Sequence, residues 1–589
     1  MRERLRTVPL DDMRPWLLLV SLSACAPPLT QPPAAAPTVE TEIPHPEVRA
    51  HRAPAPLSGG SLALTPDGRM AIAADPDRDV VWRVDLEGEA LEVLEPVWLD
   101  PGDRPGRVVV DDVGVAHVTL RGAAAVVSFA TGRPRPRRRA VCPSPTGLAF
   151  EGDVLHVACA GGDLVTLDPR GGRRTRELRG DLRDVGAGAE GVWVSRFRSA
   201  ELVRVSSARA VSTTPPDRRG PVGDVDDLGF AARVAWRTLG APDGGHWMLH
   251  QWHLTDPLVG EALEGRDRYY GGGVVETGVT RFRDGRVERT AAFDFVALPV
   301  DAVALAPDRI AVAEAGRREV TILYPETGRD FPYASRRHDG GRPVALAFHP
   351  AVGIVTQYVD PPGIGIFEDR RPTEYGGRHA RLGEGAPPDR GHELFHDVTA
   401  RGVACATCHP EGADDGHVWR LDHAARRTQT LTGGIAGSAP FHWAGDVASF
   451  ADLMSLVFVE RMGGEAPGPG DVEALERWVD TLPDPPRPLE RDRDAARRGR
   501  ALFRDPEIGC ARCHSGARGT DGRSHDVGTG GAFQTPPLVG LAERLPLFHD
   551  GCAETLEARF AECHTPGHGR IEHLDDGQRA DLVAHLRSF

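Results

Sequence analysis

The sequence predicts a multidomain protein, with an N-terminal all-β propeller of about seven blades followed by a mostly α-helical C-terminal part. Its 589 residues are too many for one hydrophobic core. Gly (68 residues) and Pro (50 residues) are plentiful, which favours a turn-rich β protein over a helical bundle. The net charge of −15 argues against nucleic acid as a partner, and the absence of Lys excludes a Walker A phosphate loop.

Residues 1–25 are predicted to form a bacterial lipoprotein signal peptide. Arg14 provides a basic flank, Trp16–Leu22 a short apolar stretch, and Leu-Ser-Ala-Cys, ending at Cys25, a cleavage box. The two acidic residues just before Met13 suit a signal badly, so Met13 is the expected start. The apolar stretch is too short to span a bilayer, and the alternative is a buried core helix.

If Cys25 carries a lipid, the protein is exported and tethered to a bacterial membrane, in the periplasm or at the cell surface. Residues 26–56 are rich in Pro and are predicted to form an extended linker between this anchor and the folded protein.

The predicted propeller covers residues 57–378, where short strands alternate with turns. Leu62–Asp85 is the clearest copy of this pattern, and Val303–Gly328 repeats its layout. Turns such as Pro66-Asp67-Gly68 supply the positive φ values that hairpins need. Several strands in each segment of roughly 40–50 residues indicate propeller blades. The repeats resemble bacterial YVTN-type propellers; an irregular β-sandwich is the alternative, and the ligand of the propeller is not indicated.

Three features of this region have ordinary explanations. The basic run Arg133–Arg139 lies between two blade-like copies and is expected to be a solvated loop. His246 and His250 share one face of a predicted strand, but no acidic or thiol partner is near them in the sequence, so we expect ordinary edge histidines. Cys142 and Cys159 are candidates for a disulfide in an exported protein.

Two Cys-x-x-Cys-His motifs carry the clearest chemical signal: Cys405 to His409 and Cys510 to His514. This motif attaches c-type haem, because its thiols bond the vinyl groups and its His becomes an iron ligand. With 9 Cys and 23 His in the chain, chance predicts only about 0.005 such motifs. The cofactor-binding residues are therefore predicted to be Cys405, Cys408, His409, Cys510, Cys513 and His514. A zinc site is the alternative.

The stretch before the first motif also contains His-Glu-x-x-His, the signature of zinc proteases, at His392 and His396. The stretch before the second motif shares its frame, since Arg390-Gly391 matches Arg498-Gly499 and Leu394-Phe395 matches Leu502-Phe503. The two histidines belong to one copy only, and no third zinc ligand is evident. We therefore interpret the shared frame as a helix that leads into a haem motif.

The last 200 residues or so resemble the bacterial di-haem cytochrome c peroxidase family, which includes the methylamine-utilisation di-haem oxidases. The resemblance rests on the two haem motifs together with "RRTQTL", "APFHWAGDVASFADLM", "FQTPPLVGLAERLPLFHDG" and "DLVAHLRSF". It implies two mostly helical c-type haem domains, here residues 385–490 and 491–589. It also implies that the N-terminal haem reduces hydrogen peroxide with electrons received through the C-terminal haem.

The resemblance further implies individual roles. His409 and His514 become the proximal iron ligands, and Trp443 lies where the family places an aromatic electron relay between the haems. The family has a peroxide-pocket Glu about nine residues after this Trp. Asp452 stands here instead, on a shorter arm, and is the predicted group for proton transfer.

The distal ligand of the C-terminal haem also departs from the family, which places a Met or a Tyr about fourteen residues after the His of "HDG". Here that position is Cys563, followed by His564, and no Met follows Met462. We predict His564 as the ligand, which lowers the reduction potential relative to Met. A disulfide between Cys552 and Cys563 is not expected, because the eight residues "TLEARFAE" between them suggest a helix about 12 Å long.

For the distal face of the N-terminal haem the sequence offers His417, His423 and His442. His423 lies nearest the position where some family members carry a His that must leave before peroxide binds, and His442 is the second choice. A Ca²⁺ ion between the haem domains is also among the expected cofactors.

The predicted function is an exported di-haem c-type oxidoreductase that reduces hydrogen peroxide. Its expected electron donor is a small redox carrier: a cytochrome c, a cupredoxin or the quinol pool. The alternatives are a di-haem electron-transfer cytochrome without enzymatic activity, and a module in which the propeller binds a partner while the haems sense redox state.

Overall fold

The computed structural model describes residues 52–188, 191–206, 209–222, 225–257, 273–327, 334–337, 341–367, 378–383, 388–421, 424–435, 437–485 and 492–589. The predicted signal peptide with Cys25 and most of the Pro-rich linker lie outside these residues. Among the described residues, no helix is long and apolar enough to span a membrane.

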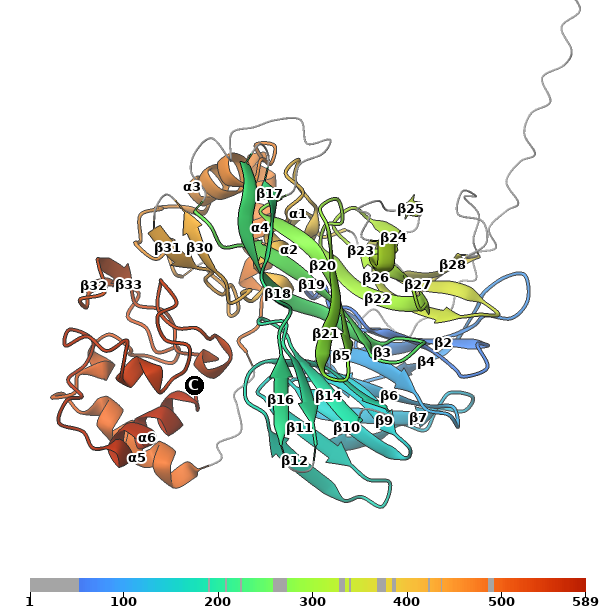
Figure 1. Ribbon diagram of the computed structural model, residues 1–589, viewed down its shortest axis with the longest axis horizontal. Coiled ribbons are helices and arrows are strands. Elements are labelled where there is room, and N and C mark those ends of the chain that lie inside the picture. Colours follow the sequence, from blue (N-terminus) through green and yellow to red (C-terminus); the bar gives the residue numbers. More distant parts are fainter. Residues whose placement is uncertain are drawn as a thin grey trace, which may run out of the picture. The chain divides into compact units, whose positions relative to one another are not determined.

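Seven antiparallel sheets, coloured blue to yellow-green in Figure 1, form the N-terminal part of the described chain. The first four blades are β1 (Leu62–Leu64), β2 (Met70–Asp75), β3 (Val80–Asp85) and β4 (Glu92–Trp98); β5 (Pro105–Val110), β6 (Val115–Leu120), β7 (Ala125–Ala130) and β8 (Arg137–Ala140); β9 (Pro145–Glu151), β10 (Val154–Cys159), β11 (Asp163–Leu167) and β12 (Arg173–Glu177); and β13 (Leu182–Gly188), β14 (Gly191–Arg196), β15 (Leu202–Val205) and β16 (Ala210–Thr213).

The other three blades complete the ring. They are β17 (Arg218–Val222), β18 (Val225–Gly240), β19 (His246–Leu254), β20 (Val275–Arg283) and β21 (Arg286–Phe293); β22 (Pro299–Ala306), β23 (Arg309–Glu314), β24 (Glu319–Leu323) and β25 (Ala334–Arg337); and β26 (Arg342–His349), β27 (Gly353–Val359), β28 (Gly363–Phe367) and β29 (His379–Arg381). One strand from each blade contacts the next in the order β1, β5, β9, β13, β18, β22 and β26, and β26 returns to β1. This closure confirms the predicted seven-bladed propeller and excludes a β-sandwich.

The strand sequences account for the burial of the sheets. Strands such as β2 (MAIAAD) and β10 (VLHVAC) are almost entirely buried, because each blade packs against a neighbour on both faces. Outer strands such as β8 (RRRA) and β12 (RRTRE) are exposed and basic. An Arg-rich outer strand discourages edge-to-edge association of blades. The basic run Arg133–Arg139 therefore contributes an exposed blade edge as well as a loop.

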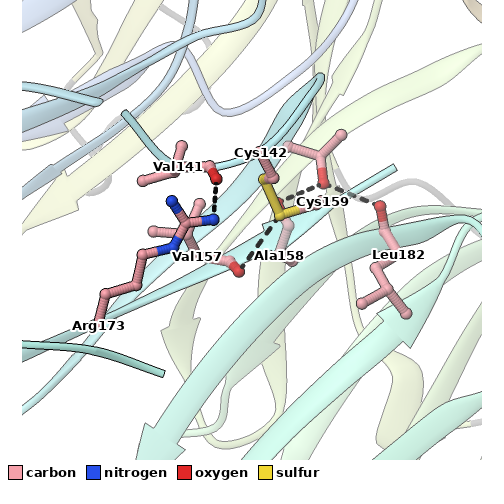
Figure 2. The surroundings of a disulfide bond; sticks show 8 residues. Val141, Cys142, Val157, Ala158, Cys159, Arg173 and Leu182 are labelled. Atoms are coloured by element: carbon pink, nitrogen blue, oxygen red, sulfur yellow. Dashed lines mark hydrogen bonds between the residues drawn. A yellow bond between two sulfur atoms is a disulfide. The ribbon is translucent and has the colours of Figure 1, made fainter. Parts of the chain in front are cut away.

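A disulfide joins Cys142, just before β9, to Cys159 at the end of β10 (Figure 2). Both cysteines are buried, and the Arg173 guanidinium on the outer strand β12 donates to the carbonyl oxygen of Val141. The sequence-based candidate pair thus forms a bond inside one blade.

The C-terminal part consists of short helices and two small hairpins. Its elements are α1 (Arg390–His396), α2 (Cys405–Cys408), η3 (Pro410–Gly412), β30 (Val418–Leu421), β31 (Ala424–Arg427), α3 (Phe450–Leu453), the π-helical η4 (Met454–Arg461), α4 (Pro469–Asp480), α5 (Arg493–Arg504), η5 (Cys510–Arg512), β32 (Ser524–Asp526), β33 (Ala532–Gln534), η6 (Leu541–Glu543), η7 (Ala558–Phe560) and α6 (Asp576–Leu586); η2 (Pro325–Thr327) follows β24 in the propeller.

The shared frame noticed in the sequence is a shared helix crossing. Helix α1 packs on α4, and α5 packs on α6. Gly391 and Gly499 lie at the crossings, where an added Cβ would overlap the backbone oxygens of Ala474 and Asp581. The neighbouring arginines bind the partner helices, Arg390 to Asp471 at 2.9 Å and Arg498 to Asp581 at 2.7 Å. The Arg-Gly pair therefore has the same role in both copies.

The predicted helix between Cys552 and Cys563 does not form, and the expectation that these cysteines stay apart is wrong. Only the short turn η7 lies in the segment, and the two Cα atoms are 5.9 Å apart in a disulfide. Helix propensity is a weak preference that tertiary contacts override. Here the Cys563 N–H donates to the carbonyl oxygen of Ala558 within the segment, and the Arg559 guanidinium donates to the carbonyl oxygen of His568 beyond it.

Candidate functional site

The first motif forms a single helical turn, and its histidine ends that turn. Cys405 and Cys408 lie in α2, and the His409 N–H donates to the carbonyl oxygen of Cys405 at 2.9 Å. The Nδ1 atom of His409 lies 3.2 Å from the carbonyl oxygen of Ala413. Because a carbonyl oxygen can only accept, the ring is protonated at Nδ1, and Nε2 keeps its lone pair for a metal.

The second motif repeats this arrangement. The His514 N–H donates to the carbonyl oxygen of Cys510 at 3.1 Å, and Nδ1 of His514 lies 3.0 Å from the carbonyl oxygen of Gly519. Gly509 enters the motif with φ of 85°, a value that favours glycine. Both histidines thus present Nε2, and both have two cysteines on the preceding turn.

Burial keeps these groups in their neutral forms. It raises the pKa of the Cys405 thiol to about 12 and the pKa of Cys408 well above its ordinary value. Burial also lowers the pKa values of His409 and His514. A neutral imidazole is the form that binds iron, so the residues present fit the donor set of a covalently attached haem.

The first motif is held against the propeller by buried charges that follow it in sequence. Glu411 in η3 forms ion pairs with Arg183 and, at 2.8 Å, with Arg121. Asp414 binds Arg198 at 3.1 Å and Arg427 at 2.6 Å. Two carboxylates of the C-terminal part therefore accept from three arginines of the propeller.

A second contact to the propeller lies beside Cys408. His253 of β19 places Nδ1 3.4 Å from a carboxylate oxygen of Asp415, and neither side chain is exposed. Its ring stacks on Trp419 and lies edge-on to His417. Trp419 belongs to the same apolar cluster as Cys408. Sequence analysis missed this cluster, because nothing local links β19 with a segment more than 150 residues later.

His246 and His250 have ordinary partners, as expected, but they are not edge histidines, because β19 is the central strand of its five-stranded sheet. His250 is fully buried, with Nε2 2.8 Å from the hydroxyl of Thr280 and Nδ1 3.1 Å from the carbonyl oxygen of Gln251. His246 is buried and packs its ring against Trp193.

The His-Glu-x-x-His histidines are structural. Nδ1 of His392 lies 3.1 Å from a carboxylate oxygen of Asp360. His396 uses both ring nitrogens: Nδ1 lies 2.8 Å from the carbonyl oxygen of His392, and Nε2 accepts from the Leu57 N–H at 3.3 Å. Zinc binding would break these contacts, which agrees with the interpretation that this chain is not a zinc protease.

Trp443 joins the segments that follow the two motifs. Its indole N–H donates to the carbonyl oxygen of Arg427 at 2.8 Å, and its own carbonyl oxygen accepts from the Gln534 N–H at 2.8 Å. The ring of His549 lies edge-on at 6.3 Å. Trp443 is therefore well placed for its predicted relay role, which stays a prediction.

Asp452 lies on the surface, in the first turn of α3, where it accepts from the Ser449 hydroxyl at 2.6 Å. This environment is that of a helix N-terminus and not of a buried pocket. Its predicted role as an acid–base group also stays a prediction.

The candidate distal ligands of the first motif occupy different environments. His417 is buried, with Nε2 2.9 Å from the carbonyl oxygen of Leu254. His442 adopts φ of 69° and lies 3.4 Å from Asp446. His423, the preferred candidate, lies outside the described residues.

On the second motif, His564 places Nε2 3.1 Å from a carboxylate oxygen of Glu572, and Cys563 is in its disulfide. A residue that sequence analysis did not consider, His568, has its ring opposite that of His514. The position of the family's distal ligand corresponds to residues 563 and 564 of this chain. The sequence feature that marks His568 is the "GHG" turn, four residues after His564.

One group of potential metal ligands occurs in the described part of the chain: Cys513, Asp521 and His525. Nε2 of His525 lies 2.7 Å from Asp521. Because Cys513 belongs to a haem motif, and Ca²⁺ takes oxygen ligands, this group is not the expected Ca²⁺ site.

Similar proteins match parts of the chain. It is 25% identical to hydrazine synthase subunit gamma from Kuenenia stuttgartiensis over 253 residues, covering 32% of this chain and 72% of that protein. It is 29% identical over 272 residues to the methylamine utilization protein MauG from Methylorubrum extorquens, covering 34% of this chain and 76% of that protein. A solved structure of Kuenenia stuttgartiensis hydrazine synthase matches with 15% identity and a TM-score of 0.40, covering 53% of this chain and 96% of that chain. No protein-family model matches.

Proposed function

We propose that this chain is an exported di-haem c-type oxidoreductase, which reduces hydrogen peroxide at the N-terminal haem with electrons delivered through the C-terminal haem. The observation that carries this proposal is the matched pair of motifs, each with two thiols and a histidine whose Nδ1 faces a backbone carbonyl. The similarity to MauG and to hydrazine synthase subunit gamma supports an enzyme of the oxidoreductase kind.

Each haem would be held by its motif alone. Cys405 and Cys408 would bond one haem, and Cys510 and Cys513 the other; each S–H adds across a vinyl double bond, so no oxidant is needed. His409 and His514 would bind the two irons through Nε2. When bound, the haems supply one-electron chemistry, and the protein controls their axial ligands, burial and approach.

Covalent attachment is tested by counting haems. We expect two haems per chain that resist acid–acetone extraction, one haem after Cys405→Ala/Cys408→Ala, and one after Cys510→Ala/Cys513→Ala. The matched control is Cys142→Ala/Cys159→Ala, which removes two cysteines from the propeller and keeps both haems. A wild-type ratio of one, or haem that extracts freely, would contradict the proposal.

Trp443 is the proposed route for electrons between the two halves, because its backbone and indole bind both segments that follow the motifs. We expect Trp443→Phe to keep both haems and to slow electron transfer between them. Flash reduction of one haem, followed optically, measures this rate; Phe450→Leu is the control for lost aromatic packing in the same part of the chain. An unchanged rate in Trp443→Phe removes the relay role.

Peroxide reduction needs two electrons and two protons for each H₂O₂, and yields two waters. In this proposal His423 would be the displaceable ligand of the N-terminal haem, and Asp452 would supply a proton. The exposure of Asp452 favours the second candidate, an electron-transfer cytochrome. Peroxide consumption by half-reduced protein decides between them: no consumption supports the cytochrome, whereas consumption at the same rate in Asp452→Ala keeps the enzyme and discards this proton donor.

Export through a lipid-modified Cys25 is part of the proposal. Two disulfides in the described residues are typical of oxidising compartments and support export. Mass spectrometry of the mature N-terminus tests it, and an unprocessed Met1 or Met13 would contradict it. A small cytochrome c, a cupredoxin or the quinol pool remains the proposed electron donor.

A further inference from the structure

The rings of His568 and His514 lie at a separation that suits two ligands of one metal ion. Their ring centroids are 6.1 Å apart, and the ring planes differ by 34°. This separation is larger than that of the stacked pair Phe533 and His549, whose centroids are 3.9 Å apart. Two imidazoles that bind one metal from opposite sides have centroids roughly 6 Å apart, because each metal–nitrogen bond is about 2.0 Å long.

We infer that His568 is the second axial ligand of the C-terminal haem iron, opposite His514. This inference rests on the proposed di-haem function and names a ligand that the sequence did not indicate. In this inference His568 takes the ligand role that the sequence analysis predicted for His564.

The unused nitrogens of the two rings support this pairing. Nδ1 of His514 faces the carbonyl oxygen of Gly519, which leaves Nε2 available. Nδ1 of His568 is buried and, in the described part of the chain, has no hydrogen-bond partner. An unpartnered buried nitrogen is costly, and binding iron through this Nδ1 would satisfy it.

The loop that carries His568 is held on both sides. The Arg570 N–H donates to the carbonyl oxygen of Ile508 at 3.0 Å, and Gly569 lies against the sulfur of Cys510. The Thr565 hydroxyl donates to the carbonyl oxygen of Val527. Since Ile508 lies two residues before the second haem motif and Cys510 is its first residue, the loop is held against that motif.

Both ring nitrogens of His564 contact charged side chains. Its Nε2 lies 3.1 Å from Glu572, and its Nδ1 lies 3.5 Å from the Arg559 guanidinium. Binding iron would require this histidine to leave Glu572. Cys563 is excluded as a ligand by its disulfide with Cys552.

Two histidine ligands give this iron a closed coordination sphere and a lower reduction potential than a His–Met pair. A closed iron passes electrons without binding small molecules. The C-terminal haem would then serve electron entry, while the open site of the proposed reaction lies at the N-terminal haem.

The test compares His568→Met with the matched variant His564→Met in the full-length holoprotein. We expect His568→Met to raise the reduction potential of the C-terminal haem and to replace its bis-histidine signature, in paramagnetic resonance and near-infrared magnetic circular dichroism, by a His–Met signature. His564→Met should change neither. The haem stays in place in both variants, because Cys510 and Cys513 hold it covalently.

A second pair of variants, with Gly in place of Met, separates the loss of each histidine from effects of the new Met side chain. His568→Gly should lose the bis-histidine signature of the C-terminal haem and regain it when imidazole is added, whereas His564→Gly should keep it throughout. Loss in His564→Gly together with retention in His568→Gly overturns the inference and restores His564. If both variants keep the bis-histidine signature, neither His568 nor His564 is the ligand. A protein without two covalent haems would instead refute the proposed function, which haem counting shows separately.

Discussion

A single hydrogen bond decides the chemistry of each motif histidine. Nδ1 of His409 and Nδ1 of His514 both face backbone carbonyl oxygens, of Ala413 and Gly519. Because these acceptors are backbone atoms, a side-chain substitution does not remove them. The turn that follows each motif therefore selects the tautomer that is protonated at Nδ1. The cysteine spacing can be read from the sequence, whereas this orientation needs the folded turn.

At the same scale, Glu314 in the propeller makes stability depend on pH. It is 2% exposed and accepts from the Ala297 N–H at 2.9 Å and the Thr321 hydroxyl at 2.9 Å. Burial raises its pKa to about 7. Because the folded pKa exceeds the unfolded one, its contribution is complete below about pH 4.5 and is lost as the pH rises through 7.

We therefore expect Glu314→Gln to be more stable than the wild type at pH 9, by roughly 2–3 kcal/mol, and similar to it at pH 5. An amide keeps the shape of the carboxyl group and avoids the buried charge. Urea unfolding at the two pH values measures the difference, with the exposed Glu89→Gln as control. A difference that does not change with pH would show that Glu314 does not titrate in this range.

At the scale of elements, the same helix crossing occurs before each haem motif. Gly391 and Gly499 let α1 and α5 approach the backbones of α4 and α6. The sequence repeat indicated a common helical frame through its matching Arg-Gly and Leu-Phe pairs. The structure shows that the Arg-Gly pair fixes the crossing.

We expect Gly499→Ala to destabilise the C-terminal part by about 1–3 kcal/mol, because the new methyl group overlaps the backbone oxygen of Asp581. This loss outweighs the helix propensity of Ala, which favours the substitution by about 1 kcal/mol. The control is Gly470→Ala in α4, where nothing lies within 4 Å of an added Cβ; it should be neutral or stabilising. Thermal unfolding monitored at the haem absorption measures the stability of both variants. Equal destabilisation by the two substitutions would contradict the role of Gly499 at the helix crossing.

At the scale of the whole molecule, buried ion pairs link the inner strands of different blades. Asp184 on β13 binds Arg107 of β5 at 2.6 Å and Arg237 of β18 at 2.9 Å, and Arg237 also binds Asp301 of β22 at 3.1 Å. These four side chains come from four blades and lie where the inner strands meet. They connect blades that share no strand hydrogen bonds.

Removing one partner of such a network leaves buried charge without compensation. We expect Asp184→Ala to lower the free energy of unfolding of the propeller by about 3–5 kcal/mol. The control is Glu87→Ala, which breaks an exposed ion pair with Arg69 and should change little. Urea unfolding followed by tryptophan fluorescence measures both variants. A small effect in Asp184→Ala would mean that the ring closes by apolar packing alone.

The attachment of the C-terminal part to the propeller has its own pH dependence through Asp414. Burial acts to raise its pKa, but the charges of Arg198 and Arg427 prevail and hold the pKa at about 2. Since this folded pKa lies below the ordinary value, the stabilisation is present above about pH 4 and is lost as the pH falls towards 2.

We expect Asp414→Asn to be less stable than the wild type at pH 7 and to approach it only as the pH falls through about 2, where the wild type also loses the charge. Unfolding midpoints between pH 2 and pH 7 test this, with the exposed Glu465→Gln as control. A constant gap across this range would assign the effect to shape and not to charge.

The sequence by itself determined the propeller, the two haem motifs and their common helical frame. These features rest on local patterns: strand alternation, turn residues, and the spacing of Cys and His within one turn. It also indicated the Cys142–Cys159 disulfide as a candidate, which the structure confirms.

Only the tertiary structure decided which distant groups meet. The Cys552–Cys563 disulfide closes a segment that has only one short turn, although its sequence suggests a helix. His568 faces His514, and His253 meets Asp415, across separations of 54 and 162 residues along the chain. Such contacts depend on how packed elements bring loops together. Neither hydrophobic periodicity nor local propensity encodes contacts between distant loops. For this reason the position counted from "HDG" predicted His564 as the ligand, whereas the fold supports His568.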